Sequence, residues 1–138
     1  MIKQAVTASL LFMLAFILSA QPLLAAGKTA KVKVTFVSAE LVENEHVGNE
    51  WWWGGYVNGK ELEEGSSVTV SATGSIKLRA EAQEQDKYPE DGIADATVKV
   101  SSLKSSINKT LNVTVTENRG RYSGNTAKWR FVFKIKKL

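Results

Sequence analysis

Apolar and polar residues alternate along most of this 138-residue chain. Val32, Val34 and Phe36 are separated by Lys33 and Thr35, and the same period of two recurs up to the last residues of the sequence. Because successive side chains of a β-strand point to opposite faces, this period predicts strands with one buried face. Eight strands are predicted: a first strand that ends near Val42, then Trp51–Val57, Lys60–Glu63, Ser67–Ser71, Ser75–Ala82, Ala96–Ser101, Lys109–Thr116 and Lys128–Lys136.

The turns between these segments indicate how the strands pair. Asn58-Gly59 is the dipeptide that most strongly predicts a two-residue β-hairpin. Short strands separated by Gly, Asn and Ser turns, without helical segments between them, favour an all-β antiparallel sandwich, for example of immunoglobulin-like type. A small closed β-barrel is the alternative, because a period of two does not distinguish the two architectures.

The first 26 residues have a different pattern. Lys3 gives a positive start, Ala5–Ala20 is almost uninterrupted in its apolar character, and Leu24-Ala25-Ala26 ends in small residues. These features predict a secretory signal peptide over residues 1–26 that is cleaved after Ala26. An uncleaved membrane anchor is the alternative, but the apolar run is short for a bilayer span of about 20 residues.

Residues 27–138 are then expected to form one domain of a protein that is secreted, periplasmic or at the cell surface. The chain contains no cysteine, so disulfides cannot stabilise it. Its stability must come from burial and strand pairing, helped in our interpretation by a bound ion.

The charge is distributed unevenly along this domain. Residues 27–97 carry 13 acidic and 7 basic side chains, a net charge of −6, whereas residues 98–138 carry 10 basic and 1 acidic, a net charge of +9. A basic half would suit an anionic membrane, a cell-wall polymer or extracellular nucleic acid, although no motif is specific for nucleic acid. The alternative is a solvated surface whose lysines protect an edge strand from aggregation.

Two acidic segments interrupt the predicted strands, Glu43–Glu50 and Asp86–Asp95. If Asn58-Gly59 forms a hairpin and each strand reverses direction, both segments fall at one end of the sandwich, together with a third loop over Asn118–Asn125. Without that hairpin they would lie at opposite ends. Carboxylates and amides gathered with glycine are what a hard cation such as Ca²⁺ requires.

Three acid-bearing or amide-bearing loops at one end of an antiparallel sandwich resemble the C2 domains, although no motif is specific for a named family. The resemblance implies that calcium is held by Asp86, Asp91 and Asp95. Further ligands would come from the first loop: Glu45, Asn49 and Glu50. C2 loops use several closely spaced aspartates, whereas the first loop here offers Glu and Asn. The alternative is that both loops are acidic only because they are solvated turns, and Pro89-Glu90-Asp91-Gly92 is a good turn sequence without any ion.

Aromatic and basic residues give candidates for surface binding. In Trp51-Trp52-Trp53 the faces alternate, so Trp52 is expected to be exposed if its two neighbours are in the core. Such a ring would stack on a sugar, insert into a membrane interface or bind a protein, unless it covers a sheet edge. The third loop adds a basic and aromatic group, which would bind an anionic surface or neutralise the acidic loops: Arg119, Arg121 and Tyr122.

Catalytic motifs are weak in this sequence. His46 is the only histidine, so a Ser-His-Asp or Cys-His mechanism and a zinc site are disfavoured. The leading interpretation is a secreted, non-enzymatic binding module, calcium-dependent, for an anionic membrane or carbohydrate surface. The alternatives are an exported protein-interaction module, such as an inhibitor or toxin-like effector, and a small glycan-active enzyme that uses loop carboxylates.

Overall fold

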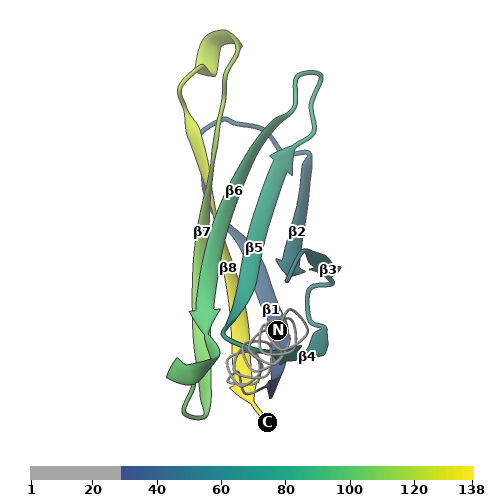
Figure 1. The fold of residues 1–138 in the computed structure, drawn as a ribbon. Helices are drawn as coiled ribbons and strands as arrows, with labels where there is room; N and C mark the ends of the chain where they lie inside the picture. Colours follow the sequence, from purple (N-terminus) through teal and green to yellow (C-terminus); the bar gives the residue numbers. More distant parts are fainter. Residues whose placement is uncertain (1–28) are drawn as a thin grey trace, which may run out of the picture.

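The computed structural model describes residues 29–138, so the expected signal peptide lies outside the described part of the chain. Eight strands form two four-stranded antiparallel sheets that pack face to face (Figure 1). Sheet A has the order β4-β1-β8-β7 and sheet B the order β3-β2-β5-β6. The strands are β1 (Ala30–Asn44), β2 (Trp51–Val57), β3 (Lys60–Leu62), β4 (Ser67–Ala72), β5 (Ser75–Glu84), β6 (Glu90–Lys99), β7 (Ser106–Thr116) and β8 (Thr126–Lys137).

The predicted β-sandwich is therefore confirmed, and the alternative of a closed barrel is wrong because the sheets do not join into one. The two short helical turns, Val100–Ser102 and Gly120–Tyr122, lie in connections between strands. Among residues 29–138 no helix has the length and apolar character needed to cross a bilayer.

The period-two pattern fills the space between the sheets. Phe36 of β1 stacks on Phe131 and Phe133 of β8 at ring-centroid distances of 5.8 and 5.0 Å. Gly55 of β2 faces these rings, and a side chain there would overlap with Phe36. Burial of such apolar side chains is the main force that holds the sheets together.

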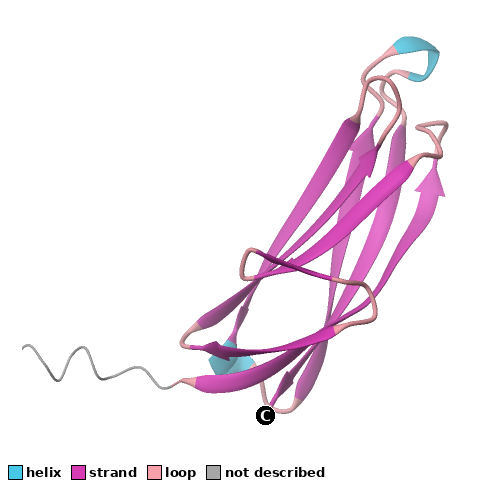
Figure 2. Cartoon of the chain, turned by 90° about the vertical axis from the view of Figure 1, so that its right-hand side faces the viewer, coloured by secondary structure: helices cyan, strands magenta, loops and turns pink. Residues whose placement is uncertain are grey.

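The two sides of the sandwich are closed differently. On one side β6 and β7 run close together without pairing, and a Cβ atom at Gly92 would overlap with the carbonyl oxygen of Thr114. On the other side residues 63–66 cross from sheet B to sheet A (Figure 2). The Glu64 carboxylate joins the sheets there, because it accepts hydrogen bonds from the Ala39 backbone N–H (2.9 Å) and the Trp53 indole N–H (3.1 Å).

The Asn58-Gly59 hairpin forms as predicted, with positive φ angles of 49° and 81° at its two central residues. The loops over residues 45–50, 85–89 and 117–125 consequently converge at one end of the sandwich (Figure 1). We call this end the loop end. The connection over residues 63–66 does not reach it, because β3 has only three residues.

One loop is shorter than the sequence indicates. Residues 90–95 were expected in a loop, but β6 begins at Glu90 and pairs with β5 along its whole length. The turn indicated by Pro89-Glu90-Asp91-Gly92 therefore does not form, because three of these residues belong to β6. Pairing with all ten residues of β5 outweighs the local preference of Asp91 and Gly92 for a turn.

Candidate functional site

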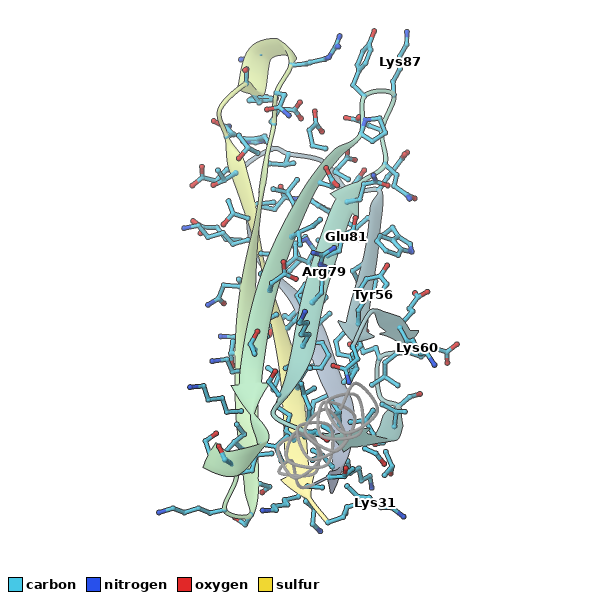
Figure 3. The ribbon with its side chains drawn as sticks, viewed as in Figure 1. Lys31, Tyr56, Lys60, Arg79, Glu81 and Lys87 are labelled. Atoms are coloured by element: carbon cyan, nitrogen blue, oxygen red, sulfur yellow. The ribbon has the colours of Figure 1, made fainter. Side chains whose placement is uncertain are left out.

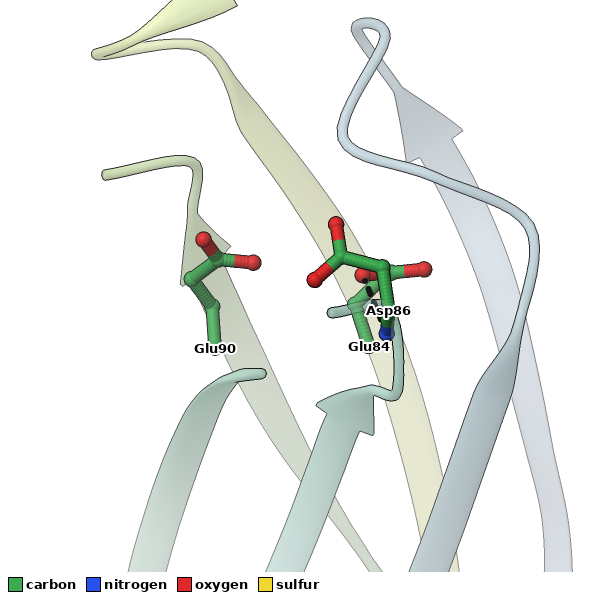
Figure 4. A group of neighbouring side chains, drawn as sticks. All are labelled: Glu84, Asp86 and Glu90. Atoms are coloured by element: carbon green, nitrogen blue, oxygen red, sulfur yellow. Dashed lines mark hydrogen bonds between the residues drawn. The ribbon is translucent and has the colours of Figure 1, made fainter. Parts of the chain in front are cut away.

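Three carboxylates meet at the loop end where β5 passes into β6. Glu84 is the last residue of β5, Asp86 lies in the following loop, and Glu90 is the first residue of β6 (Figure 4). Glu84 and Glu90 are direct partners in the β5–β6 register. One carboxylate oxygen from each of the three residues lies within 4.8 Å of the others. We call Glu84, Asp86 and Glu90 the acidic triad.

Strand parity explains why Glu84 and Glu90 are inside the sandwich, whereas Asp86 is exposed in the loop between them. Inward positions of β5 fall on every second residue and carry Ile76, Leu78, Ala80 and Ala82, so the next inward position is Glu84. Its side chain is 1 % exposed, and that of its partner Glu90 is 4 % exposed. Charged side chains at such positions are costly unless they are paired or bind a metal.

The first loop covers Glu84 with its backbone. The Glu84 carboxylate accepts a hydrogen bond from the Asp86 backbone N–H (3.1 Å) and a longer one from the Glu50 backbone N–H (3.4 Å). Gly48 lies directly against this carboxylate, and any side chain at position 48 would overlap with it. The acidic triad is thus linked to the fold of the first loop.

Glu90 has a different environment. Its Oε2 atom is fully buried and has no hydrogen-bond partner among residues 29–138. Glu117, 8 % exposed at the end of β7, lies beside it, and the Glu117 carboxylate accepts a hydrogen bond from the Arg119 backbone N–H (3.2 Å). Two neighbouring buried carboxylates are favourable only if a proton or a cation lies between them.

The electrostatics of the triad favour proton or cation binding. Burial is the main cause that raises the pKa of Glu84, and the neighbouring Asp86 adds to it. Burial likewise raises the pKa of Glu90, and its contact with Glu117 raises it further. Both shifts mean that negative charge at these positions is unfavourable without a positive partner.

Two contacts between side chains join the three loops. The Arg119 guanidinium lies 4.0 Å from the centre of the Tyr88 ring, which connects the β5–β6 and β7–β8 loops. The rings of His46 and Tyr122 stack at 4.6 Å and connect the β1–β2 and β7–β8 loops. A cavity of about 590 Å³ opens to solvent beside the triad and is lined by Asp86, Tyr88, Glu117, Arg119 and Gly120.

Of the six residues expected to bind metal, only Asp86 belongs to the triad. Glu45 and Asn49 are exposed in the first loop, and Glu50 turns its backbone N–H rather than its carboxylate toward Glu84. Asp91 and Asp95 point to the outer face of sheet B, because they lie at outward positions of β6. Asp95 forms an exposed ion pair with Arg79 at 2.7 Å, which lowers the pKa of Asp95.

The structure thus shows buried carboxylates that the expected ligand set omits: Glu84, Glu90 and Glu117. Two of them could have been found by continuing the strand parity, because Glu84 follows Ala82 and Glu117 follows Val115 at inward spacing. A carboxylate at an inward position at the end of a strand is the relevant signal, and it is stronger than acidity in a loop.

Of the four residues expected to bind a surface, Trp52 lies apart from the other three. Arg119, Arg121 and Tyr122 are exposed at the loop end, with the Arg121 guanidinium 5.6 Å from the Tyr122 ring. Trp52 lies on the outer face of sheet B, where its half-buried ring covers Gly54.

The two neighbouring tryptophans also differ from expectation. Trp51 and Trp53 both contact Trp129, with ring centroids 5.5 and 5.0 Å away. Trp53 is nevertheless 39 % exposed, so the condition for an exposed Trp52, that both of its neighbours lie in the core, is not met. Its ring lies at the side of the sandwich that residues 63–66 cross, where the indole N–H donates a hydrogen bond to Glu64.

Comparison with known proteins gives no further identification. No protein-family model matches the chain, and no curated protein is significantly similar to it.

Proposed function

We propose that this protein is an exported, non-enzymatic binding module that binds Ca²⁺ at the acidic triad. The observation that carries this proposal is the buried Glu90 Oε2 atom, which has no partner and belongs to a group of three carboxylates. An isolated buried carboxylate oxygen costs folding free energy, and a cation at this point would remove that cost.

The dimensions of the triad suit one calcium ion. Ca²⁺ binds oxygen at about 2.3–2.6 Å, so two ligands on opposite sides of the ion are at most about 5 Å apart. The triad oxygens lie within 4.8 Å of one another. Three carboxylates supply three to six of the six to eight oxygens that Ca²⁺ takes, and water from the neighbouring cavity would complete the shell.

The ligand chemistry favours Ca²⁺ over other metals. The triad contains only carboxylates, which suit hard cations, and the sole histidine stacks on Tyr122 rather than facing the triad. Mg²⁺ requires near-ideal octahedral geometry and keeps several waters, which agrees less well with two almost fully buried glutamates.

Calcium at the triad would act on the surrounding loops. Glu84 contacts the backbone of the first loop, and Glu90 lies beside Glu117 at the start of the third loop. An ion that fixes these carboxylates would stabilise the arrangement that presents Arg119, Arg121 and Tyr122 to solvent. We propose that this basic and aromatic surface then contacts an anionic membrane surface beside the ion.

The burial of Glu84 and Glu90 weighs against a glycan-active enzyme. Glycoside hydrolysis needs carboxyl groups that touch the glycosidic oxygen and the anomeric carbon of the substrate. Glu84 and Glu90 are almost inaccessible to a sugar. A protein-interaction module remains the second candidate, since the contacts between His46 and Tyr122 and between Arg119 and Tyr88 hold exposed basic and aromatic side chains in place at the loop end.

Calcium titration of the purified protein tests the proposal. We expect 1 mM Ca²⁺, compared with a chelator, to raise the melting temperature by about 10 °C if the ion is near 100 times its dissociation constant, and isothermal calorimetry to give one site. Glu90→Gln should abolish the shift. Asp95→Asn, which alters a carboxylate on the outer face, should keep it. Absence of a shift in the unmodified protein, or an unchanged shift in Glu90→Gln, would refute calcium binding at the triad.

A further inference from the structure

A second charged region lies at the opposite end of the molecule, on the outer face of sheet A. Lys31 and Lys33 follow each other on this face of β1, and Lys134 and Lys136 do so on β8. All four side chains are exposed. We call these four residues the lysine face. Lys31 marks this end in Figure 3, and Lys87 marks the loop end.

The strand register places these lysines side by side on two neighbouring strands. Lys33 is the direct partner of Lys136 in the β1–β8 ladder, and Thr35 is the partner of Lys134. Directly opposed residues have Cβ atoms about 5 Å apart, and like-charged side chains in such a pair are destabilising. A cavity of about 140 Å³ lies on this face of the two strands and is lined by Lys33, Thr35, Lys134 and Lys136.

Nothing on the described part of sheet A neutralises this charge. β4, β7 and β8 contain no acidic residue, and the two glutamates on the outer face of β1 pair elsewhere. Glu40 bonds to Arg130 at 3.0 Å and Glu43 to Lys128 at 3.3 Å, both nearer the loop end. Among residues 29–138 the lysine face makes no ion pair within 4.0 Å.

Protection of a sheet edge does not explain these lysines. Lysine guards edge strands because they carry unpaired backbone groups. β1 and β8 are the two central strands of sheet A, and each is paired on both sides. The repulsion between Lys33 and Lys136 is therefore not offset by protection of a sheet edge.

We infer that the lysine face binds a flexible anionic polymer through its phosphate groups. Three ammonium groups line this cavity and complement one phosphate group in it, and Lys31 lies beside it for a neighbouring phosphate along the polymer. Lysine binds phosphate as a point charge and does not require the planar geometry that arginine prefers. Thr35 adds a hydroxyl at the cavity wall. A planar layer of lipid headgroups would place its phosphates over the face rather than within the cavity.

Binding of inorganic polyphosphate to the purified protein tests this inference, measured by calorimetry with a chelator present so that calcium plays no part. We expect the logarithm of the affinity to fall with the logarithm of the salt concentration with a slope of about −3, since each phosphate contact contributes about −0.7 for a single-stranded polymer. Lys33→Gln/Lys136→Gln should lower affinity about tenfold or more and reduce the slope by about half.

Lys60→Gln/Lys77→Gln is the matched control, because it removes the same charge from sheet B. It should change affinity less than twofold. Equal losses in the two double variants would mean that only net charge matters and would overturn the inference. Failure of polyphosphate to bind at low salt would also overturn it, as would binding to anionic lipid vesicles that polyphosphate does not displace.

Discussion

The loop end and the lysine face differ in the side of the sheets that carries their charge. At the loop end carboxylates occupy inward positions and are removed from water, so each needs a proton or a cation to be tolerated. On the lysine face ammonium groups occupy outward positions and remain hydrated, so their repulsion is weak and screened by salt. The same strand alternation therefore gives one region of buried negative charge and one region of hydrated positive charge.

The largest expected effect concerns the packing of the first loop on the triad. Gly48→Ala should destabilise the protein by roughly 3 kcal/mol, because position 48 has a φ of 146° and its new Cβ atom would overlap with the Glu84 carboxylate. Gly120→Ala is the control, since position 120 also has a positive φ but faces open space, and it should cost about 1 kcal/mol. Urea denaturation measures both. Equal and small costs would show that the loop end is not rigidly packed on its carboxylates.

A smaller effect should appear as a pH dependence of stability without calcium. Folding raises the pKa of Glu84 and Glu90, so the folded protein binds their protons more tightly than the unfolded chain does. Their contribution is least unfavourable below the ordinary glutamate pKa, and stability falls as the pH rises through the raised values. The neighbouring Asp86 and Glu117 carboxylates add to these rises in the pKa of Glu84 and Glu90.

Melting curves from pH 4 to pH 8 in a chelator would measure this decline. Glu84→Gln/Glu90→Gln should flatten it, and added Ca²⁺ should stabilise the unmodified protein more at pH 8 than at pH 5, because protons compete with the ion. A stability that rises with pH over this range would contradict the buried, charged triad. The Arg79–Asp95 pair acts in the opposite direction, since the pKa of Asp95 is lowered. Its contribution is present above the ordinary aspartate pKa and is lost as the pH falls through the lowered value, so it affects only the acid end of this range.

The smallest expected effect is on the lysine face. Lys33→Gln/Lys136→Gln should stabilise the protein by about 0.2–1 kcal/mol at low salt, because it removes two like charges that are directly opposed. The gain should disappear at about 1 M salt, where the screening length is about 3 Å. Urea denaturation at both salt concentrations checks this. A loss of stability at low salt would mean that the lysine stems contribute packing that outweighs their repulsion.

The sequence predicts the fold well because burial imposes a simple period. The alternation in Val32, Val34 and Phe36 and the Asn58-Gly59 turn were sufficient for the sandwich and for the convergence of the three loops. Local signals were less reliable at the start of β6. There the turn preference of Asp91 and Gly92 is weaker than continuous pairing with β5, which no local pattern encodes.

The site was harder to predict than the fold because acidity in a loop does not indicate burial. The acidic loop identifies Asp86, but Glu84 and Glu90 are buried because they occupy opposed inward positions on two strands. The contact of Glu90 with Glu117 depends on how sheets A and B approach each other. That approach is set by packing at Gly92 and Thr114, residues that are far apart in sequence.

The two central strands of sheet A also determine the end of the molecule from which a tether leaves. β1 starts and β8 ends at the end that carries the lysine face, so a tether attached before Thr29 or after Leu138 leaves from that end (Figure 1). The 12 residues of β8 hold the loop end about 40 Å from such a tether. A protein displayed in this way would keep its lysine face close to the supporting surface while its loop end reaches outward.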